Sequence, residues 1–334
     1  MKKLNVFHII FISLAFCLVL AIVLRIRGWV RVVGYDEISG SDDSIADFEC
    51  HDHIMPLTDE QYNLIRQSEE VILILGNDPF AEDRDLPGGL AAMLEEASGA
   101  EVINCAVRGS RVSMTSPSFD IKQSPWNLFS PYYLACVACG DLDYEPDLRL
   151  SEEALGDDFP EEGEEVLRTL KETDLSDVDV IVFFYDGIDY LEGAPTGFDD
   201  SRYDDPFCTF FGSLSSATEV LRSAAPGARF IVMSAPYMYH VAANGDWEAC
   251  EDHPNSENAD LSSYVLAEYW LCVGAHDFSF LDNYYTGTNL AEGRLLLTDG
   301  RHLNAEGRKV ILDRFMYALT YYDEENLGKV EFSK

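Results

Sequence analysis

Short apolar runs alternate with longer amphipathic segments along most of this chain. The run at Val71–Leu75 contains five consecutive apolar residues, which is typical of a strand covered on both faces. Four more strands are predicted, at Glu101–Val107, Val178–Tyr185, Arg229–Ser234 and Phe278–Leu281. Helices are predicted between them, at Leu90–Ala97, Glu164–Lys171, Leu214–Ala224 and Leu261–Val273. This alternation predicts an α/β protein with three layers, α/β/α, around a doubly wound, flavodoxin-like parallel sheet.

The amino-terminal segment has a different character. Residues 4–24 form an almost unbroken apolar run with lysines before it and arginines after it. The run is long enough to span a bilayer, and no small-residue cleavage site follows it. We therefore predict an uncleaved transmembrane helix, preceded by a short cytoplasmic tail at 1–3. Residues 25–60 are predicted to be an acidic juxtamembrane tether, and 61–325 the folded domain.

Three polar insertions interrupt the alternation, at 113–163, 192–211 and 237–258. The first is rich in aromatic residues, and we expect it to form either a wall for a substrate or an extra helical layer. The second contains four aspartates in "GFDDSRYDDPF", without the spacing of a calcium loop. A solvated loop is the favoured interpretation of the second insertion.

Charge and cysteine spacing limit the partners of the chain. It has 60 acidic and 23 basic residues and a formal net charge of -37, which excludes nucleic acid as a partner. The eight cysteines are irregularly spaced, so no disulfide framework can be read from them. Cys136 and Cys139 form a lone C-x-x-C without the second ligand pair of a zinc site, which favours packing or a simple disulfide. We expect no metal and no cofactor.

The most specific signal is the string "LLLTDGRHLNAEGRKVIL" near the carboxyl terminus. Asp299 and His302 lie three residues apart on a predicted turn that leads through Asn304 into an amphipathic helix. At this spacing the carboxylate can accept the N–H of one imidazole nitrogen, which leaves the other nitrogen as a general base. The alternative is an aspartate that caps a turn beside a surface histidine. The helix carries one apolar stripe, formed by Ile311, Phe315, Ala318, Leu319 and Tyr322.

At these residues the chain resembles the SGNH/GDSL hydrolase superfamily, whose members place an Asp-x-x-His pair just before the last helix. The resemblance covers about residues 68–322. Gly76, Asn77 and Asp78 stand where the family has the Gly-Asp-Ser turn that carries its nucleophile. Gly109, in "NCAVRGS", matches the glycine whose backbone N–H enters the oxyanion hole.

The chain departs from the family pattern at two positions. Asp78 replaces the nucleophilic serine, and Ile188 replaces the oxyanion asparagine in the block "FYDGIDY", which includes Asp186 and Asp189. Loss of such an oxyanion donor costs on the order of 3 to 4 kcal/mol of transition-state stabilisation. An acyl group on an aspartate would form an anhydride. The ordinary serine mechanism is therefore not expected.

Three accounts of Asp78 are open at this point. In the first, Asp78 and His302 form an ion pair, and the protein binds a ligand without cleaving it. In the second, Asp78 or His302 activates a water directly. In the third, covalent catalysis continues with a hydroxyl moved to Ser110 or Ser113.

The surroundings of the site supply further candidate binding residues. They are Asn77, Arg108, Asp186 and Asp189. Arg108 and Arg111 flank the oxyanion glycine and would hold an anionic group or pair with nearby aspartates. We favour the pairing, because the aspartates would otherwise crowd negative charge at one sheet edge.

The resemblance also implies a function class. Relatives of this design act on acyl groups of cell-envelope polysaccharides, so an acylated envelope glycan is the expected partner by analogy. We expect a single-pass plasma-membrane protein with the bulk of the chain extracytoplasmic. As an enzyme it would be an esterase or acyl transferase with His302 as base, Asp299 as orienting residue and Gly109 as oxyanion donor. As a non-enzyme it would be a glycan-binding or assembly factor.

Overall fold

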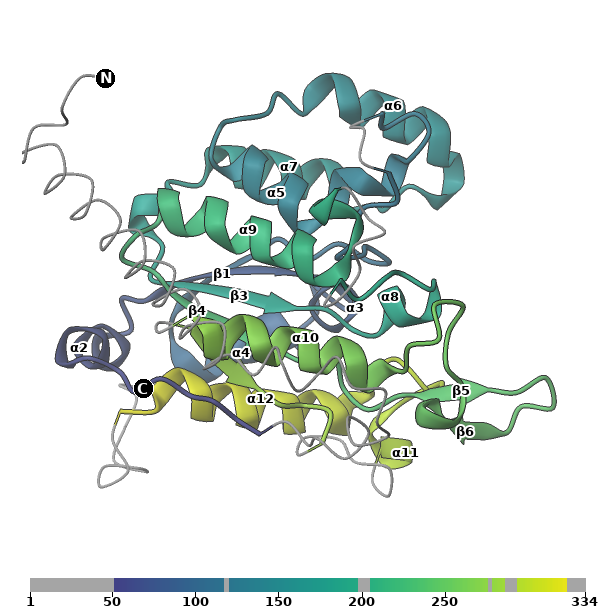
Figure 1. Ribbon diagram of the computed structural model, residues 1–334. Coiled ribbons are helices and arrows are strands. Elements are labelled where there is room, and N and C mark those ends of the chain that lie inside the picture. Colours follow the sequence, from purple (N-terminus) through teal and green to yellow (C-terminus); the bar gives the residue numbers. More distant parts are fainter. Residues whose placement is uncertain (1–50, 117–119, 198–204, 276–277, 286–292, 323–334) are drawn as a thin grey trace, which may run out of the picture. The chain divides into compact units, whose positions relative to one another are not determined.

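The computed structural model describes residues 51–116, 120–197, 205–275, 278–285 and 293–322 (Figure 1). All of them belong to one compact unit, which begins at Cys50. The transmembrane helix predicted at 4–24, the tail before it and most of the predicted tether lie outside the described residues. Within the described ranges, no helix has both the length and the apolar character needed to cross a membrane.

A five-stranded parallel sheet forms the centre of the unit, as the sequence predicted. Its spatial order is β2-β1-β3-β4-β7, and each neighbouring pair is parallel. The strands are β1 (Val71–Gly76), β2 (Glu101–Asn104), β3 (Val180–Phe184), β4 (Arg229–Met233) and β7 (Phe278–Leu281). The central strands are buried along nearly their whole length, because helices cover both faces of the sheet.

The principal helices fall where the hydrophobic pattern predicted them. They are α4 (Leu90–Ser98), α7 (Gly163–Glu172), α9 (Phe210–Ala224), α10 (Leu261–Gly274) and α12 (Ala305–Thr320). Side-chain caps fix the starts of the last two: Asp260 accepts from the Ser263 N–H at 3.0 Å, and Asn304 accepts from the Gly307 N–H at 3.0 Å. Helix α12 packs against α4, whereas α10 packs against α9. These pairs form the outer layers of the predicted three-layer arrangement (Figure 1).

The end of the predicted tether is part of the folded unit. His53 forms an antiparallel bridge with Phe280 of the edge strand β7. Helix α2 (Asp59–Gln67) then begins with a capping box, in which Thr58 and Gln61 exchange hydrogen bonds. Residues from His53 onward therefore pack on the domain.

The first insertion forms an extra helical layer, one of the two alternatives for it. It contains η2 (Pro125–Phe129), α5 (Pro131–Ala138), α6 (Glu145–Leu155) and η3 (Gly156–Asp158), and α5 packs on α7 and α9. Phe129 and Tyr133 are fully buried in this layer. Trp126 differs, because its indole ring lies beside Gly109.

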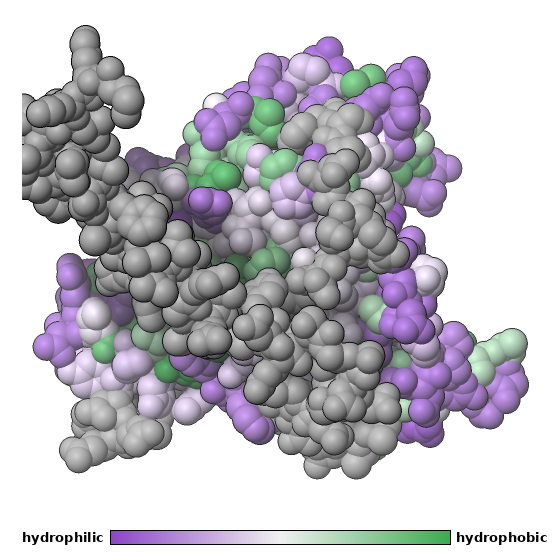
Figure 2. Space-filling model, viewed as in Figure 1, coloured by the Kyte–Doolittle hydropathy of each residue, from purple (hydrophilic) through white to green (hydrophobic). Residues whose placement is uncertain are grey.

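The other two insertions are mostly surface segments. The third forms a hairpin, β5 (Tyr239–Val241) with β6 (Trp247–Ala249), followed by η6 (Cys250–Asp252). In the second, residues 198–204 with three of the four aspartates lie outside the described residues, and η5 (Pro206–Cys208) follows. Hydrophilic side chains dominate the surface over α6 and around the hairpin (Figure 2). The remaining short elements are α3 (Asp78–Ala81), η4 (Leu175–Asp177), α8 (Ile188–Leu191) and α11 (Gly293–Leu296).

The described cysteines are all free thiols. Cys136 and Cys139 lie in and just after α5 and form no disulfide, which removes one of the interpretations of the C-x-x-C pair. Packing is the interpretation that agrees with the structure.

Candidate active site

The candidate site lies at the carboxyl ends of β1 and β3. These strands are adjacent and parallel, so the residues that follow them meet at one edge of the sheet. Asp78 begins the short helix α3 directly after β1, and Asp186 follows β3. The turn before α12 brings Asp299 and His302 to the same edge, although both lie more than 200 residues after Asp78 in the sequence.

The Asp78 carboxylate is held on both oxygens. Its Oδ1 accepts the backbone N–H of Gly109 at 2.7 Å. Its Oδ2 lies 3.3 Å from Nε2 of His302 and also pairs with the guanidinium of Arg301. The side chain is only 5% exposed. The carboxylate thus uses both the donor and the base that the sequence assigned to catalysis.

The predicted carboxylate–imidazole pair is present. Nδ1 of His302 lies 2.7 Å from Oδ2 of Asp299, and the His302 backbone N–H bonds to the other oxygen at 3.0 Å. Asp299 therefore fixes the ring so that Nε2 faces Asp78. Asp299 also caps the turn, because its Oδ1 accepts the backbone N–H groups of Arg301 and His302, but the histidine ring is bound to it and is not an unrelated surface group.

Arg301 is the site residue that the sequence reasoning missed. Its Nε donates to Oδ2 of Asp186 at 2.6 Å, while its Nη2 contacts Asp78, so one guanidinium joins the two carboxylates. The signal was available, because Arg301 stands between Asp299 and His302 in a chain with few basic residues. The positive charge of Arg301 therefore offsets the negative charges of the Asp78 and Asp186 carboxylates.

Asn77 connects the two strand ends beneath the ion pairs. Its amide nitrogen donates to Asp186 at 2.8 Å and to the Ser110 carbonyl at 3.1 Å, and its amide oxygen accepts the Asp186 backbone N–H at 2.8 Å. All three groups are buried. Asn77 was predicted to bind a ligand. Its amide group instead forms hydrogen bonds that position Asp186 and the loop that carries Gly109 and Ser110, here called the oxyanion loop.

The ionisation states follow from burial and these contacts. The hydrogen bond to Asp78 is the largest cause that raises the pKa of His302, to about 9, with burial opposing it and Asp299 adding to it. Burial raises the pKa of the Asp78 carboxyl, but His302, Arg301 and the Gly109 N–H outweigh it and hold that pKa below its ordinary value. Burial also raises the pKa of Asp186, against the charge of Arg301. At neutral pH the pair is an imidazolium facing a carboxylate.

Glu82 is a further acidic residue at the rim of the site. Its Oε1 lies 3.9 Å from Nε2 of His302. Burial raises the pKa of this carboxyl, and the neighbouring Asp78 charge raises it further, whereas the charge of His302 lowers it. Sequence reasoning did not select it, although it lies one helical turn after Asp78.

The remaining predicted binding residues have other partners. Asp189 accepts the backbone N–H groups of Val112 and Ser113 at 2.8 and 2.9 Å, so it holds the oxyanion loop in place. Arg111 pairs with Glu192 at 3.5 Å. Among the described residues no ion pair joins Arg108 or Arg111 to an aspartate, so the predicted pairing was wrong, although the charge of Arg111 still acts on the Asp189 carboxylate. The backbone N–H of Arg108 donates to Glu162.

The displaced-serine account does not fit the positions of its hydroxyls. Ser110 is fully buried, and its Oγ donates to the Gly76 carbonyl at 3.3 Å. The Ser113 Oγ donates to Asp189 at 2.5 Å. Neither hydroxyl lies in hydrogen-bond contact with His302, so the imidazole can deprotonate neither of these two serines.

Three side chains of the site are chemically able to ligate a metal. Asp78, Asp186 and His302 offer atoms that all lie within 4.8 Å of one another. The guanidinium of Arg301 already bridges the two carboxylates. The cationic charge at this position is thus supplied by the chain itself.

Comparison with known proteins supports the fold. One solved crystal structure aligns with a TM-score of 0.51 at 19% identity, covering 76% of this chain and 98% of that chain. A possible lipase from Chitinophaga pinensis aligns with a TM-score of 0.46 at 13% identity, covering 73% and 95%. A candidate GDSL-like lipase from Bacteroides ovatus has values of 0.42 and 11%, with 75% and 97% covered. The alignment with the TM-score of 0.51 supports the α/β fold.

These likenesses concern the fold alone, because the identities are low. No protein-family model matches the chain, and no curated protein sequence matches it. What the site does must therefore be argued from its own residues.

Proposed function

We propose that this chain is a hydrolase-like protein that has lost serine-type acyl transfer and acts by binding. The observation that carries the proposal is the position of the Asp78 carboxylate. It takes the Gly109 N–H that would stabilise an oxyanion and faces the His302 nitrogen that would deprotonate a nucleophile. A substrate carbonyl would have to displace a charged internal ligand from both groups.

The protonation states argue in the same direction. With its pKa raised to about 9, His302 is protonated at neutral pH and has no lone pair at Nε2 to act as a base. Asp78 is ionised, but an acyl group on its oxygen would be an anhydride, which gives up the advantage of an ester intermediate. Both requirements of the serine mechanism are therefore missing.

We further propose that the ligand is a cell-envelope glycan and that the chain is anchored in the plasma membrane with its folded domain outside the cytoplasm. The apolar run at 4–24 supports the membrane anchor, and the resemblance to envelope acyl hydrolases suggests the location of the domain and the ligand class. Protease treatment of intact cells tests the topology, because an external domain is digested without lysis. Co-sedimentation of the full-length chain with purified cell-wall polysaccharide tests the ligand class.

Ester hydrolysis by the full-length chain tests the loss of acyl transfer. We expect no hydrolysis of p-nitrophenyl acetate above background by the wild type, and measurable hydrolysis by Asp78→Ser. In this variant a hydroxyl replaces the carboxylate and releases the Gly109 N–H. Because Ile188 still stands where a second oxyanion donor would be, the rate should remain about 100-fold to 1000-fold below that of a complete site.

The matched control is the double variant Asp78→Ser with His302→Ala, which should lose the gained activity. Wild-type hydrolysis that His302→Ala abolishes would show instead that the site activates water, and the proposal would be abandoned.

A further inference from the structure

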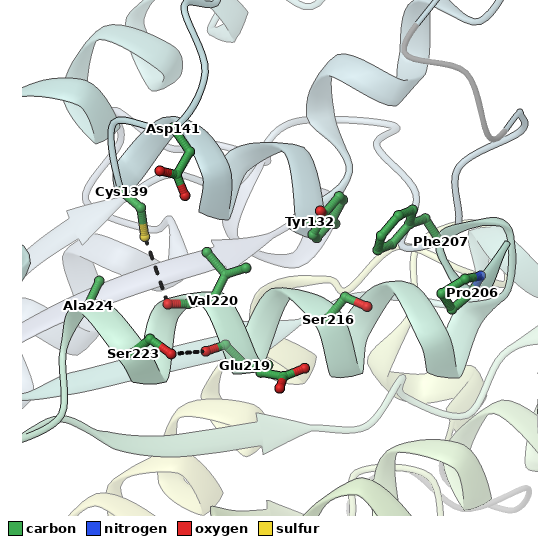
Figure 3. A pocket seen from close by; sticks show the side chains of 10 residues that line it. All are labelled: Tyr132, Cys139, Asp141, Pro206, Phe207, Ser216, Glu219, Val220, Ser223 and Ala224. Atoms are coloured by element: carbon green, nitrogen blue, oxygen red, sulfur yellow. Dashed lines mark hydrogen bonds between the residues drawn. The ribbon is translucent and has the colours of Figure 1, made fainter.

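A cavity lies between α5 and α9, away from the Asp78 site (Figure 3). Its volume is about 580 Å³, within the range of small-molecule sites. None of its lining residues belongs to the Asp78 site. One wall comes from α5 and the turn after it, the floor from α9, and one end from η5.

Two aromatic rings close one end of the cavity. Tyr132 of α5 and Phe207 of η5 are stacked with ring centroids 4.0 Å apart and planes inclined by 9°. Figure 3 shows both rings beside the amino-terminal part of α9. Such a stack provides a flat, rigid wall for an apolar or aromatic group, and aromatic faces also attract cations.

Two carboxylates line the same cavity, and no basic residue does. Asp141 stands at the end opposite the rings, and Glu219 projects from α9 (Figure 3). Both are exposed. Within the described part of the chain, neither carboxylate accepts a hydrogen bond or forms an ion pair. The charge of the whole chain, -37, adds a long-range attraction for cations.

Cys139 lines the wall of the cavity, and its thiol is not expected to react at neutral pH. The Sγ of Cys139 donates to the Val220 carbonyl at 3.9 Å. Burial raises the pKa of this thiol to about 11, so the nucleophilic thiolate is scarce at neutral pH. With Val220 and Ala224, it makes part of the lining apolar, whereas Ser216 and Ser223 of α9 add hydroxyl groups.

We propose that this cavity binds a small organic cation, an ammonium group carried on an apolar or aromatic body. The body lies against the Tyr132–Phe207 wall and the Val220 side chain of the floor, and the ammonium group pairs with Asp141 or Glu219. The features act together, because an anionic ligand would be repelled by both carboxylates and a purely polar cation would leave the apolar surface uncovered. This site is independent of the function proposed for Asp78.

Three ligands of nearly equal size test the charge requirement. They are phenethylamine, which is cationic at neutral pH, 2-phenylethanol, which is neutral, and phenylacetate, which is anionic. Binding to the full-length chain is measured by isothermal titration calorimetry. We expect phenethylamine to bind up to about fivefold more tightly than the alcohol, since one exposed ion pair is worth up to about fivefold in affinity. Phenylacetate should not bind detectably.

Variants locate the binding site. The double variant Asp141→Asn with Glu219→Gln should abolish the preference for the amine, and Phe207→Ala should weaken the binding of both the amine and the alcohol. Glu153→Gln, which removes an exposed helical carboxylate in α6 outside the cavity, should leave all three affinities unchanged. Equal binding of amine and alcohol, absence of amine binding, or an amine preference that survives in the double variant would overturn the proposal.

Discussion

The ion pair between Asp78 and His302 makes a quantitative prediction for the variant Asp78→Asn. Asparagine has nearly the same shape and can still accept the Gly109 N–H, so the substitution mainly removes the negative charge facing the imidazole. The hydrogen bond to Asp78 is the largest cause of the raised pKa of His302. In the variant this pKa should fall from about 9 towards the ordinary value of 6.5.

The size of the effect on stability follows from the shift. One pKa unit corresponds to about 1.4 kcal/mol, so a change from 6.5 to about 9 corresponds to about 3 kcal/mol. The His302 side chain is 26% exposed, and solvent screening reduces this figure. We expect about 1 to 3 kcal/mol of the free energy of unfolding to depend on pH through this group.

The pH window has a definite direction. A histidine whose pKa is higher in the folded state stabilises the fold fully below its unfolded pKa of 6.5, and the stabilisation disappears as the pH rises through about 9. The wild type should therefore exceed Asp78→Asn in unfolding free energy by more at pH 6 than at pH 10. Any difference that persists at pH 10 reports the lost contact with Arg301, which stays charged.

Urea unfolding of the two full-length proteins at both pH values measures this difference, and NMR titration of the His302 ring measures the pKa directly. Groups that titrate equally in both proteins cancel in the comparison. The ion pair would be refuted by a stability difference that is the same at pH 6 and pH 10, together with an unchanged His302 pKa. The proposal that Asp78 blocks the Gly109 N–H and the His302 nitrogen would then also be abandoned.

Two further substitutions test the network beneath the pair. Arg301→Leu removes the cation that contacts the buried Asp186 and should cost about 3 to 5 kcal/mol of unfolding free energy in urea titrations. Arg301→Lys should recover part of this loss. Wild-type stability of the leucine variant would contradict the pairing of Arg301 with the two carboxylates. Asn77→Ala removes three buried hydrogen bonds and should cost about 2 to 4 kcal/mol by the same measurement. A loss below about 0.5 kcal/mol would mean that Asn77 does not hold Asp186 in place.

The strands and main helices could be predicted from sequence because each is coded locally. Val71–Leu75 is apolar at every position, and Asp260 and Asn304 are cap residues immediately before apolar-patterned helices. The predicted and observed elements differ mainly in the residues at which they begin and end. The strand predicted to reach Val107 ends as β2 at Asn104, although the Cys105 and Val107 N–H groups still bond to the carbonyls of Ile74 and Gly76 in β1. The capping box at Thr58 was a local signal that was overlooked.

The partners of charged side chains could not be predicted in the same way. Arg108 and Arg111 flank Gly109, which the sequence places in the same site as Asp78 and Asp186. Ion pairs between these arginines and the aspartates were therefore predicted. In the structure their place is taken by Arg301, because the turn before α12 crosses the carboxyl ends of β1 and β3. Sequence separation carries no information about which of several cations reaches a given carboxylate.

The sequence alone determined the parallel α/β fold, the Asp299–His302 pair and the absence of a serine at position 78. Each of these depends on residues close together in the chain or on the identity of one residue. Only the tertiary structure decided that Asp78 takes up both the Gly109 N–H and the His302 nitrogen, with Arg301 joining it to Asp186. These contacts bridge up to 224 positions, and they form because parallel strands deliver distant segments to one edge of the sheet.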